Sequence, residues 1–227
     1  VVARLQDGQA AVVGYVAGIL TLTPSHDWRH EHALHHATAG DLDRRGRGDV
    51  WTLTVREYRE ASRWKRLGYR LYRNPLVLFG VGPLFVFLLR QRVPRPGSGL
   101  RERLSVHLTN LALALILLLA AVTVGLKAVL LVHLPIMAVA GAAGVWLFYV
   151  QHQYENAYWE RGGQRDYVAA ALQGSSLYQL PRVLQWFTGN IGFHHIHHLR
   201  PRIPNYHLQA CQDSVPVLQH VQPLTLR

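Results

Sequence analysis

The histidines of this chain include two copies of one pattern, His-x-x-His-His. The first copy comprises His32, His35 and His36, and the second comprises His194, His197 and His198. On a helix, positions i, i+3 and i+4 share one face, so each copy can direct three imidazoles at one point. Neutral imidazole suits iron, zinc, copper and nickel. The spacing therefore predicts metal binding, and histidines of the surface or core without a ligand are the weaker alternative.

His152 is a further candidate ligand, because it directly follows the last apolar run of the chain. A lone histidine at the end of a membrane span is more often an interfacial polar residue, but its expected position on the same face as the two copies favours metal binding. Seven histidines are too many for one ion and supply two ions with three or four nitrogens each. A pair of redox-capable ions suits oxygen activation better than a zinc hydrolase, which needs only three protein ligands and a carboxylate base nearby.

Carboxylates are sparse around these histidines. Metal-bound histidines usually donate their other ring N–H to a carboxylate or carbonyl, and Asp41 and Glu155 are the favoured outer-shell partners. For each of them, a solvated loop charge is the alternative. His26 and His30 also stand four apart on the same expected helix as the first copy, and their role as ligands stays open.

Two long apolar runs, residues 105–125 and 128–150, must position these groups. Each run can cross a hydrocarbon core of roughly 30 Å, which takes about 20 residues. The sequence therefore predicts a transmembrane helical hairpin over residues 105–150. Arginine-rich stretches at 44–73 and 90–103 border the apolar segments, and positive charge beside membrane spans marks the cytoplasmic side.

Two shorter apolar segments are harder to place. Residues 10–22 are too short to span a membrane comfortably, and residues 76–89 are interrupted by Gly80, Gly82 and Pro83. If residues 76–89 crossed the membrane, three crossings would separate the two histidine copies, and one metal site could not contain both. We therefore expect residues 76–89 to be re-entrant or interfacial.

The remaining segments are expected on the cytoplasmic side. Residues 26–73 carry the first histidine copy, and residues 151–227 form a helical cap that carries the second. Within the first of these regions, the aromatic and basic residues of 50–70 predict an amphipathic helix. It would lie either at the membrane surface, with its arginines towards phosphates, or on the surface of a soluble cap.

Composition excludes several classes of protein. The 227 residues carry a net charge of +11, but no stretch interleaves base-stacking aromatics with a basic groove pattern, so we expect no nucleic-acid partner. The single cysteine, Cys211, cannot form an internal disulfide or supply the main metal ligands. The predicted fold class is all-α, a single domain over residues 1–227 in which a membrane helical hairpin carries a cytoplasmic cap with a histidine-rich two-metal site.

Three segments resemble a known family. They are WRHEHALHHATAGDLDRRGRGDVWTLTVREY, FYVQHQYENAYW and GNIGFHHIHHLRPRIPNYHL. In order and character they are similar to the second histidine box, the intervening histidine and the third box of membrane-bound fatty acid desaturases, especially the bacterial acyl-lipid type that acts at the Δ12 or ω-6 position. The resemblance covers essentially the whole chain, and the boxes belong to the wider desaturase and hydroxylase superfamily.

The resemblance implies a non-haem di-iron centre that uses O₂ and two electrons to remove two hydrogens from a fatty acyl chain. The implied iron ligands are His32, His35, His36, His152, His194, His197 and His198, whereas His195 falls outside the spacing. It also implies a membrane lipid or acyl substrate and an external electron donor, either ferredoxin-like or cytochrome b5-like. The implied location is a bacterial inner membrane, with the active site on its cytoplasmic face.

One departure from the family pattern concerns its first histidine box, which lies upstream of the second. His26 and His30 have the H-x-x-x-H spacing but directly abut the second box, whereas the family separates the two by an apolar stretch similar to residues 10–22. We therefore expect the true first box to precede Val1, and this 227-residue piece to bind iron weakly and lack activity. Two alternatives to desaturation stay open: a hydroxylase or ketolase of the same superfamily, and a non-catalytic membrane metal-binding or transport protein.

Overall fold

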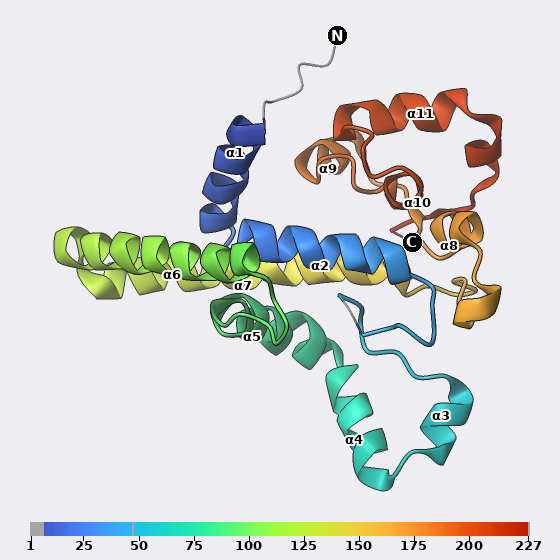
Figure 1. Ribbon diagram of the computed structural model, residues 1–227, viewed down its shortest axis with the longest axis horizontal. Coiled ribbons are helices and arrows are strands. Elements are labelled where there is room, and N and C mark those ends of the chain that lie inside the picture. Colours follow the sequence, from blue (N-terminus) through green and yellow to red (C-terminus); the bar gives the residue numbers. More distant parts are fainter. Residues whose placement is uncertain (1–6, 47, 227) are drawn as a thin grey trace. The chain divides into compact units, whose positions relative to one another are not determined.

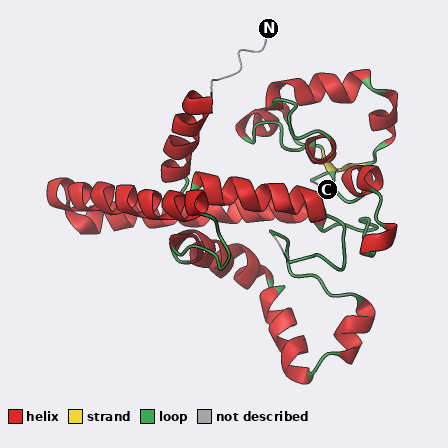
Figure 2. Cartoon of the chain, in the orientation of Figure 1, coloured by secondary structure: helices red, strands yellow, loops and turns green. Residues whose placement is uncertain are grey.

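The chain is mainly helical in its computed structural model, which describes residues 7–46 and 48–226 (Figures 1 and 2). The described strands, β1 (Leu177–Tyr178) and β2 (Pro223–Leu224), form one short parallel pair. The predicted dominance of helix is thus confirmed. The contacts divide the chain into two compact units, a first unit of residues 1–33 and 55–145 and a second unit of residues 34–54 and 146–227.

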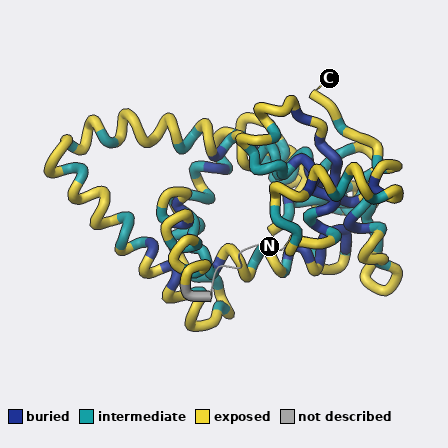
Figure 3. Tube along the Cα trace, turned by 90° about the horizontal axis from the view of Figure 1, so that it is seen from above, coloured by how far each residue is buried: buried dark blue, intermediate teal, exposed yellow. Residues whose placement is uncertain are grey.

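The long apolar runs of the first unit form helices where the sequence predicts them. Helix α6 is Leu100–Ala120, the π-helical turn η3 is Ala121–Gly125, and α7 is Leu126–His152. The chain reverses direction between α6 and α7 (Figures 1 and 3), where Gly125 adopts a φ of +96° that L side chains rarely take. The helical run of residues 100–152 is long and apolar enough to cross a membrane.

Residues 76–88 are helical, and Gly80, Gly82 and Pro83 do not end the helix. The chain winds through a π-helical segment η1 (Leu76–Val81), then α5 (Gly82–Leu88) and the short turn η2 (Arg90–Arg92). Pro83 lies in the first turn of α5, directly after the π-helical turns of η1, and it is buried. Together with the helix before it, which meets it at a bend of 61°, this segment has the length and composition of a bent membrane segment.

The other helices of the first unit are α1 (Asp7–Leu20), α2 (Ser25–Thr38), α3 (Val55–Glu60) and α4 (Arg63–Tyr72). Helix α2 confirms the predicted polar helix of the first histidine copy. The single helix predicted over residues 50–70 is wrong, because the chain breaks before Ser62, whose side chain caps α4 by accepting a hydrogen bond from the Lys65 N–H. The start of α2 is held by Arg95, whose guanidinium lies 3.3 Å from Asp27 and 3.0 Å from Glu31.

The second unit has a compact apolar core. The elements of the second unit are the ends of α2 and α7, the helices α8 (Tyr167–Gln173), α9 (Arg182–Phe187), α10 (His194–Leu199) and α11 (Leu208–Ser214), the strand pair, and the 3₁₀ turns η4 (Gly162–Gln164), η5 (Asn205–His207) and η6 (Pro216–His220). Its buried apolar cluster consists of Leu177, Phe193, Ile196, Leu208 and Leu218. Ile196 is the apolar residue within His194–Leu199 that enters this core, so burial of α10 fixes the directions of the histidines around it.

Candidate metal centre

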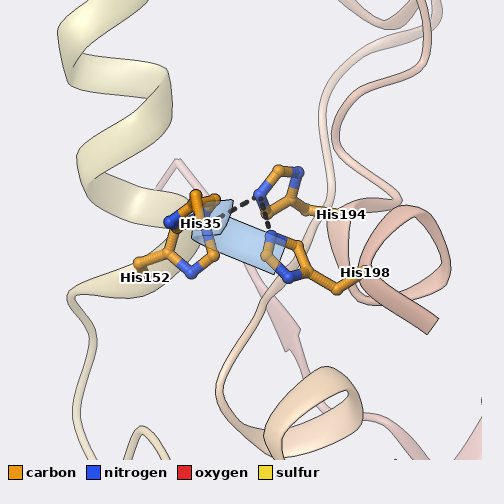
Figure 4. Close-up of side chains that lie close together, drawn as sticks. All are labelled: His35, His152, His194 and His198. Carbon is orange, nitrogen blue, oxygen red and sulfur yellow. Dashed lines mark hydrogen bonds between the residues drawn. The ribbon is translucent and has the colours of Figure 1, made fainter. Parts of the chain in front are cut away.

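Four histidines of the second unit converge on one point (Figure 4). This four-histidine group consists of His35 near the end of α2, His152 at the end of α7, and His194 and His198 one turn apart on α10. The Nε2 of His152 lies 3.1 Å from that of His35 and 2.9 Å from that of His194, and the Nε2 atoms of His194 and His198 are 3.1 Å apart. All four side chains are buried.

These spacings fit the ligand shell of one metal ion. Imidazole nitrogens bind divalent ions at about 2.0–2.1 Å, so neighbouring ligand atoms set near right angles around one ion are separated by about 3 Å. The observed separations of 2.9–3.1 Å match that value. The donor set is nitrogen alone, which suits iron, zinc, copper or nickel and not magnesium or calcium.

In two members of the group, the Nδ1 atom, which faces away from the centre, has a hydrogen-bond partner. The Nδ1 of His35 lies 2.8 Å from the Asp49 carboxylate, and the Nδ1 of His152 lies 3.2 Å from the Gly174 carbonyl oxygen. Because both partners can only accept, each Nδ1 carries the proton, and each neutral ring presents an Nε2 lone pair to the centre. Two lone pairs that face each other at 3.1 Å repel, and a shared cation removes that repulsion.

Burial keeps the α10 members in the form that binds metal. Burial, with the neighbouring imidazoles as a lesser cause, places the pKa of both His194 and His198 well below the usual histidine value. Burial likewise lowers the pKa of His197. These rings are therefore neutral at neutral pH, with a lone pair available for a metal.

A second histidine pair, His36 and His197, lies beside the four-histidine group in the second unit. Their Nε2 atoms are 3.1 Å apart, and the ring of His36 stacks on that of His198 with centroids 4.1 Å apart. His36 is buried and His197 is half-buried. His32 belongs to the first unit, one turn before His36 on α2, and its ring stacks on Trp28 at 4.6 Å.

Six of the seven histidines predicted as ligands thus gather within the second unit, and the seventh, His32, shares the helix that carries two of them. His195, which the predicted spacing leaves out, points elsewhere: its Nε2 lies 2.9 Å from the Gln212 side-chain oxygen on α11. His26 and His30 remain in the first unit, where the His26 N–H donates to Ser105 and His30 is exposed.

The choice of outer-shell carboxylates needs correction, because Asp49 occupies the position expected for Asp41 or Glu155. Asp41 accepts hydrogen bonds from Arg44 and from the backbone of Asp43, and Glu155 is exposed. The cause is the chain turn after α2, where the segment around Asp41 pairs with Glu160 and the following loop returns Asp49 to His35. Spacing along the chain gives no sign that this loop brings Asp49 back to His35.

Other contacts of the group were also absent from the sequence-based prediction. Phe148, one turn before His152 on α7, packs against the rings of His35 and His152, with centroids 5.3 Å and 5.1 Å away. The Tyr167 hydroxyl donates to the His198 carbonyl oxygen at 2.7 Å, which ties α8 to α10. The i−4 spacing of Phe148 from His152 was a usable signal, whereas nothing local to Tyr167 indicated its role.

Comparison with known proteins identifies the family of this chain. The family model described as "Fatty acid desaturase" matches residues 4–220. A "Fatty acid desaturase" of Bacillus subtilis is 47% identical over 216 residues, which cover 95% of this chain and 61% of that protein. This chain therefore belongs to the fatty acid desaturase family.

Plant relatives are more distant. The "Probable fatty acid desaturase DES1" of Sorghum bicolor is 30% identical, over 92% of this chain and 55% of that protein. The "sn-2 acyl-lipid omega-3 desaturase (ferredoxin), chloroplastic" of Arabidopsis thaliana is 27% identical, over 92% of this chain and 48% of that protein. The chain thus spans about half to three fifths of the length of these curated relatives.

Proposed function

We propose that this chain carries the di-iron centre of an O₂-dependent fatty acyl desaturase in lipid metabolism. The four-histidine group would hold one iron, and the second histidine pair, joined by His32, would hold the other. His32 is included because it precedes His36 by one helical turn on α2, which places the two side chains on one face. Bound iron would supply the activation of O₂ that an unactivated carbon–hydrogen bond needs.

The protein's own residues would orient and enclose this centre. Asp49 and the Gly174 carbonyl fix which nitrogen of His35 and His152 carries the proton, so that the other nitrogen faces the metal. Phe148 presents an apolar ring to the same two histidines and limits access of water. Exclusion of water protects an oxidising site from side reactions and favours reaction with the acyl chain.

The proposed substrate is a fatty acyl chain esterified in a membrane lipid, oxidised at the Δ12 or ω-6 position. Support comes from the resemblance of the histidine boxes and from relatives whose names specify acyl-lipid desaturation. Methylenes along a chain are chemically alike, so positioning alone would select the bond. The exposed large apolar side chains of α6 and α7, among them Leu115, Ile116 and Val139, suit hydrocarbon and support an integral membrane protein. We place it in a bacterial inner membrane, and the arginine-rich stretches beside the apolar segments favour an active site on the cytoplasmic face.

The proposed electron donor is an external, acidic carrier of the ferredoxin or cytochrome b5 type. The net charge of +11 favours an acidic partner, and one relative has ferredoxin in its name. The two electrons from this carrier, the two hydrogens from the acyl chain and two protons from solvent together account for the reduction of O₂ to two waters.

The observation that carries the proposal is the buried four-histidine group, with separations of 2.9–3.1 Å between neighbouring ring nitrogens. The test is expression of the natural protein that contains this chain, in a host of known lipid composition, with mapping of double bonds beside its His197→Ala variant. We expect lipids lighter by two hydrogens with the parent and none with the variant. Lipids heavier by one oxygen would identify a hydroxylase or ketolase, and new unsaturation that persists in the variant would refute the site.

A further inference from the structure

Helix α4, Arg63–Tyr72, carries two chemically different faces, and none of its residues is buried. Trp64, Leu67 and Leu71 recur at spacings of three and four, so they form one apolar face, with exposed fractions of 69%, 46% and 55%. The rest of the helix circumference is basic. It carries four positive side chains and no acidic one, Arg63, Lys65, Arg66 and Arg70, and Arg73 adjoins its end.

Only a partner that is anionic at its edge and apolar beneath matches both faces. An acidic protein would pair with the basic face but would leave the three large apolar side chains in water. A neutral apolar surface would cover those side chains but would offer no negative charge to the basic face. In an anionic phospholipid bilayer, phosphates lie directly beside hydrocarbon, so the two faces of one helix reach both layers together.

Local contacts hold the basic side chains at the boundary between the two faces. The Arg63 guanidinium lies over the Trp64 ring, 5.2 Å from its centroid, and Arg70 donates a hydrogen bond to the Tyr58 hydroxyl at 2.6 Å. Tryptophan and tyrosine favour the headgroup region, where an apolar ring and a polar group are both satisfied. These contacts hold the Arg63 guanidinium beside the Trp64 ring and the Arg70 guanidinium beside the Tyr58 ring.

The chain that follows α4 has the composition of a segment that enters hydrocarbon. After a bend of 61°, residues 76–92 continue as the apolar helical segment of η1 and α5, in which Leu76 is 80% exposed. A basic amphipathic helix along a surface, followed by a sharp bend into an apolar helix, is the arrangement expected where a chain passes from headgroups into lipid.

We propose that α4 is an interfacial anchor that binds anionic phospholipid, with Trp64, Leu67 and Leu71 among the upper acyl carbons and the basic face on the phosphates. The anchor lies outside the histidine site, so it does not depend on the reaction proposed above. Salt screens the electrostatic contribution to lipid binding by α4 and leaves the apolar contribution unchanged.

The test uses single-cysteine variants of the protein with Cys211→Ser, labelled with an environment-sensitive fluorophore. Leu67→Cys reports on the apolar face, and Arg66→Cys is the matched control on the basic face. In phosphatidylcholine vesicles that contain phosphatidylglycerol, we expect brominated lipid to quench the label at residue 67 at least about twofold more than at residue 66. Omission of phosphatidylglycerol, or high salt, should reduce that difference.

Equal quenching at the two positions, or a label at residue 67 that stays in water in all vesicles, would overturn the proposal. Shielding that appears only when ferredoxin is added would identify a carrier-docking surface and exclude lipid as the occupant. A far-ultraviolet circular dichroism spectrum and a thermal unfolding midpoint equal to those of the unlabelled protein establish that each labelled variant is folded. If Leu67→Cys fails this check, Trp64→Cys on the same face replaces it, with the same two expectations.

Discussion

The four-histidine group and the second histidine pair use the same ligand type but differ in enclosure. Every member of the four-histidine group is buried, and two of its rings are oriented by Asp49 and Gly174. In the pair, His197 is half-buried, and His36 is held by stacking on His198. The difference indicates that the four-histidine group is preorganised, whereas the second histidine pair is easier for a small molecule or a substrate to reach.

The largest effect is expected from loss of a ligand in the enclosed group. His194→Ala removes a central nitrogen, and we expect desaturation to fall by more than about 100-fold, beyond the effect typical of outer-shell changes. Product formation in membranes, with bound iron measured alongside, checks this expectation.

His195→Ala is the matched control, because it changes the adjacent residue of α10, whose ring points to Gln212. It should destabilise the second unit but retain iron at the four-histidine group. Equal loss of iron in both variants would mean that α10 folding, and not ligation, explains the result.

An intermediate effect is expected from Asp49→Asn, which weakens the hydrogen bond that orients His35. Changes of this kind typically lower metal affinity about 10–100-fold. Competition with a chelator, followed by absorbance, measures the affinity. Asp41→Asn alters a buried carboxylate that contacts Arg44, so a similar loss of affinity there would return Asp41 to the outer shell.

Sequence patterns were informative where chemistry follows helix geometry. The i, i+3, i+4 spacing predicted that His194, His197 and His198 act together; α10 brings His194 and His198 into the four-histidine group, whereas His197 pairs with His36. Asp49 was not favoured because its contact depends on the path of the loop after α2, which no local pattern specifies. The break before α4 depends on the Ser62 cap, a local signal that the aromatic and basic pattern of residues 50–70 obscured.

Acid should destabilise the metal-free protein. Burial lowers the pKa of His194 and His198, whereas in the unfolded chain these histidines titrate near 6.5. The unfolded state therefore binds more protons below that pH, so stability is complete above about pH 6.5 and is lost as the pH falls from there towards the lowered pKa values. Thermal unfolding of the metal-free protein between pH 7.5 and 5.5 should show a falling midpoint, and a constant midpoint would contradict neutral buried imidazoles.

The smallest effect is expected at the open edge of the second site. Trp28→Ala removes the ring stacked on His32 at 4.6 Å. Such ring pairs contribute about 0.5–1.5 kcal/mol, so iron affinity at the second site should fall about 2–12-fold while the four-histidine group is unaffected. Trp28→Phe keeps an aromatic ring and should restore most of the affinity. A uniform loss at both sites would show that Trp28 acts through the fold of α2.

Iron stoichiometry measured across the two histidine sets tests the central claim most directly. The natural protein that contains this chain and its His194→Ala and His36→Ala variants are purified and compared by metal analysis and Mössbauer spectroscopy. We predict two irons per chain in the parent, with one signal lost in each variant and a different signal in each case. A single iron in the parent that either variant abolishes would contradict two sites, and a parent that binds no iron when it is supplied would contradict the centre itself.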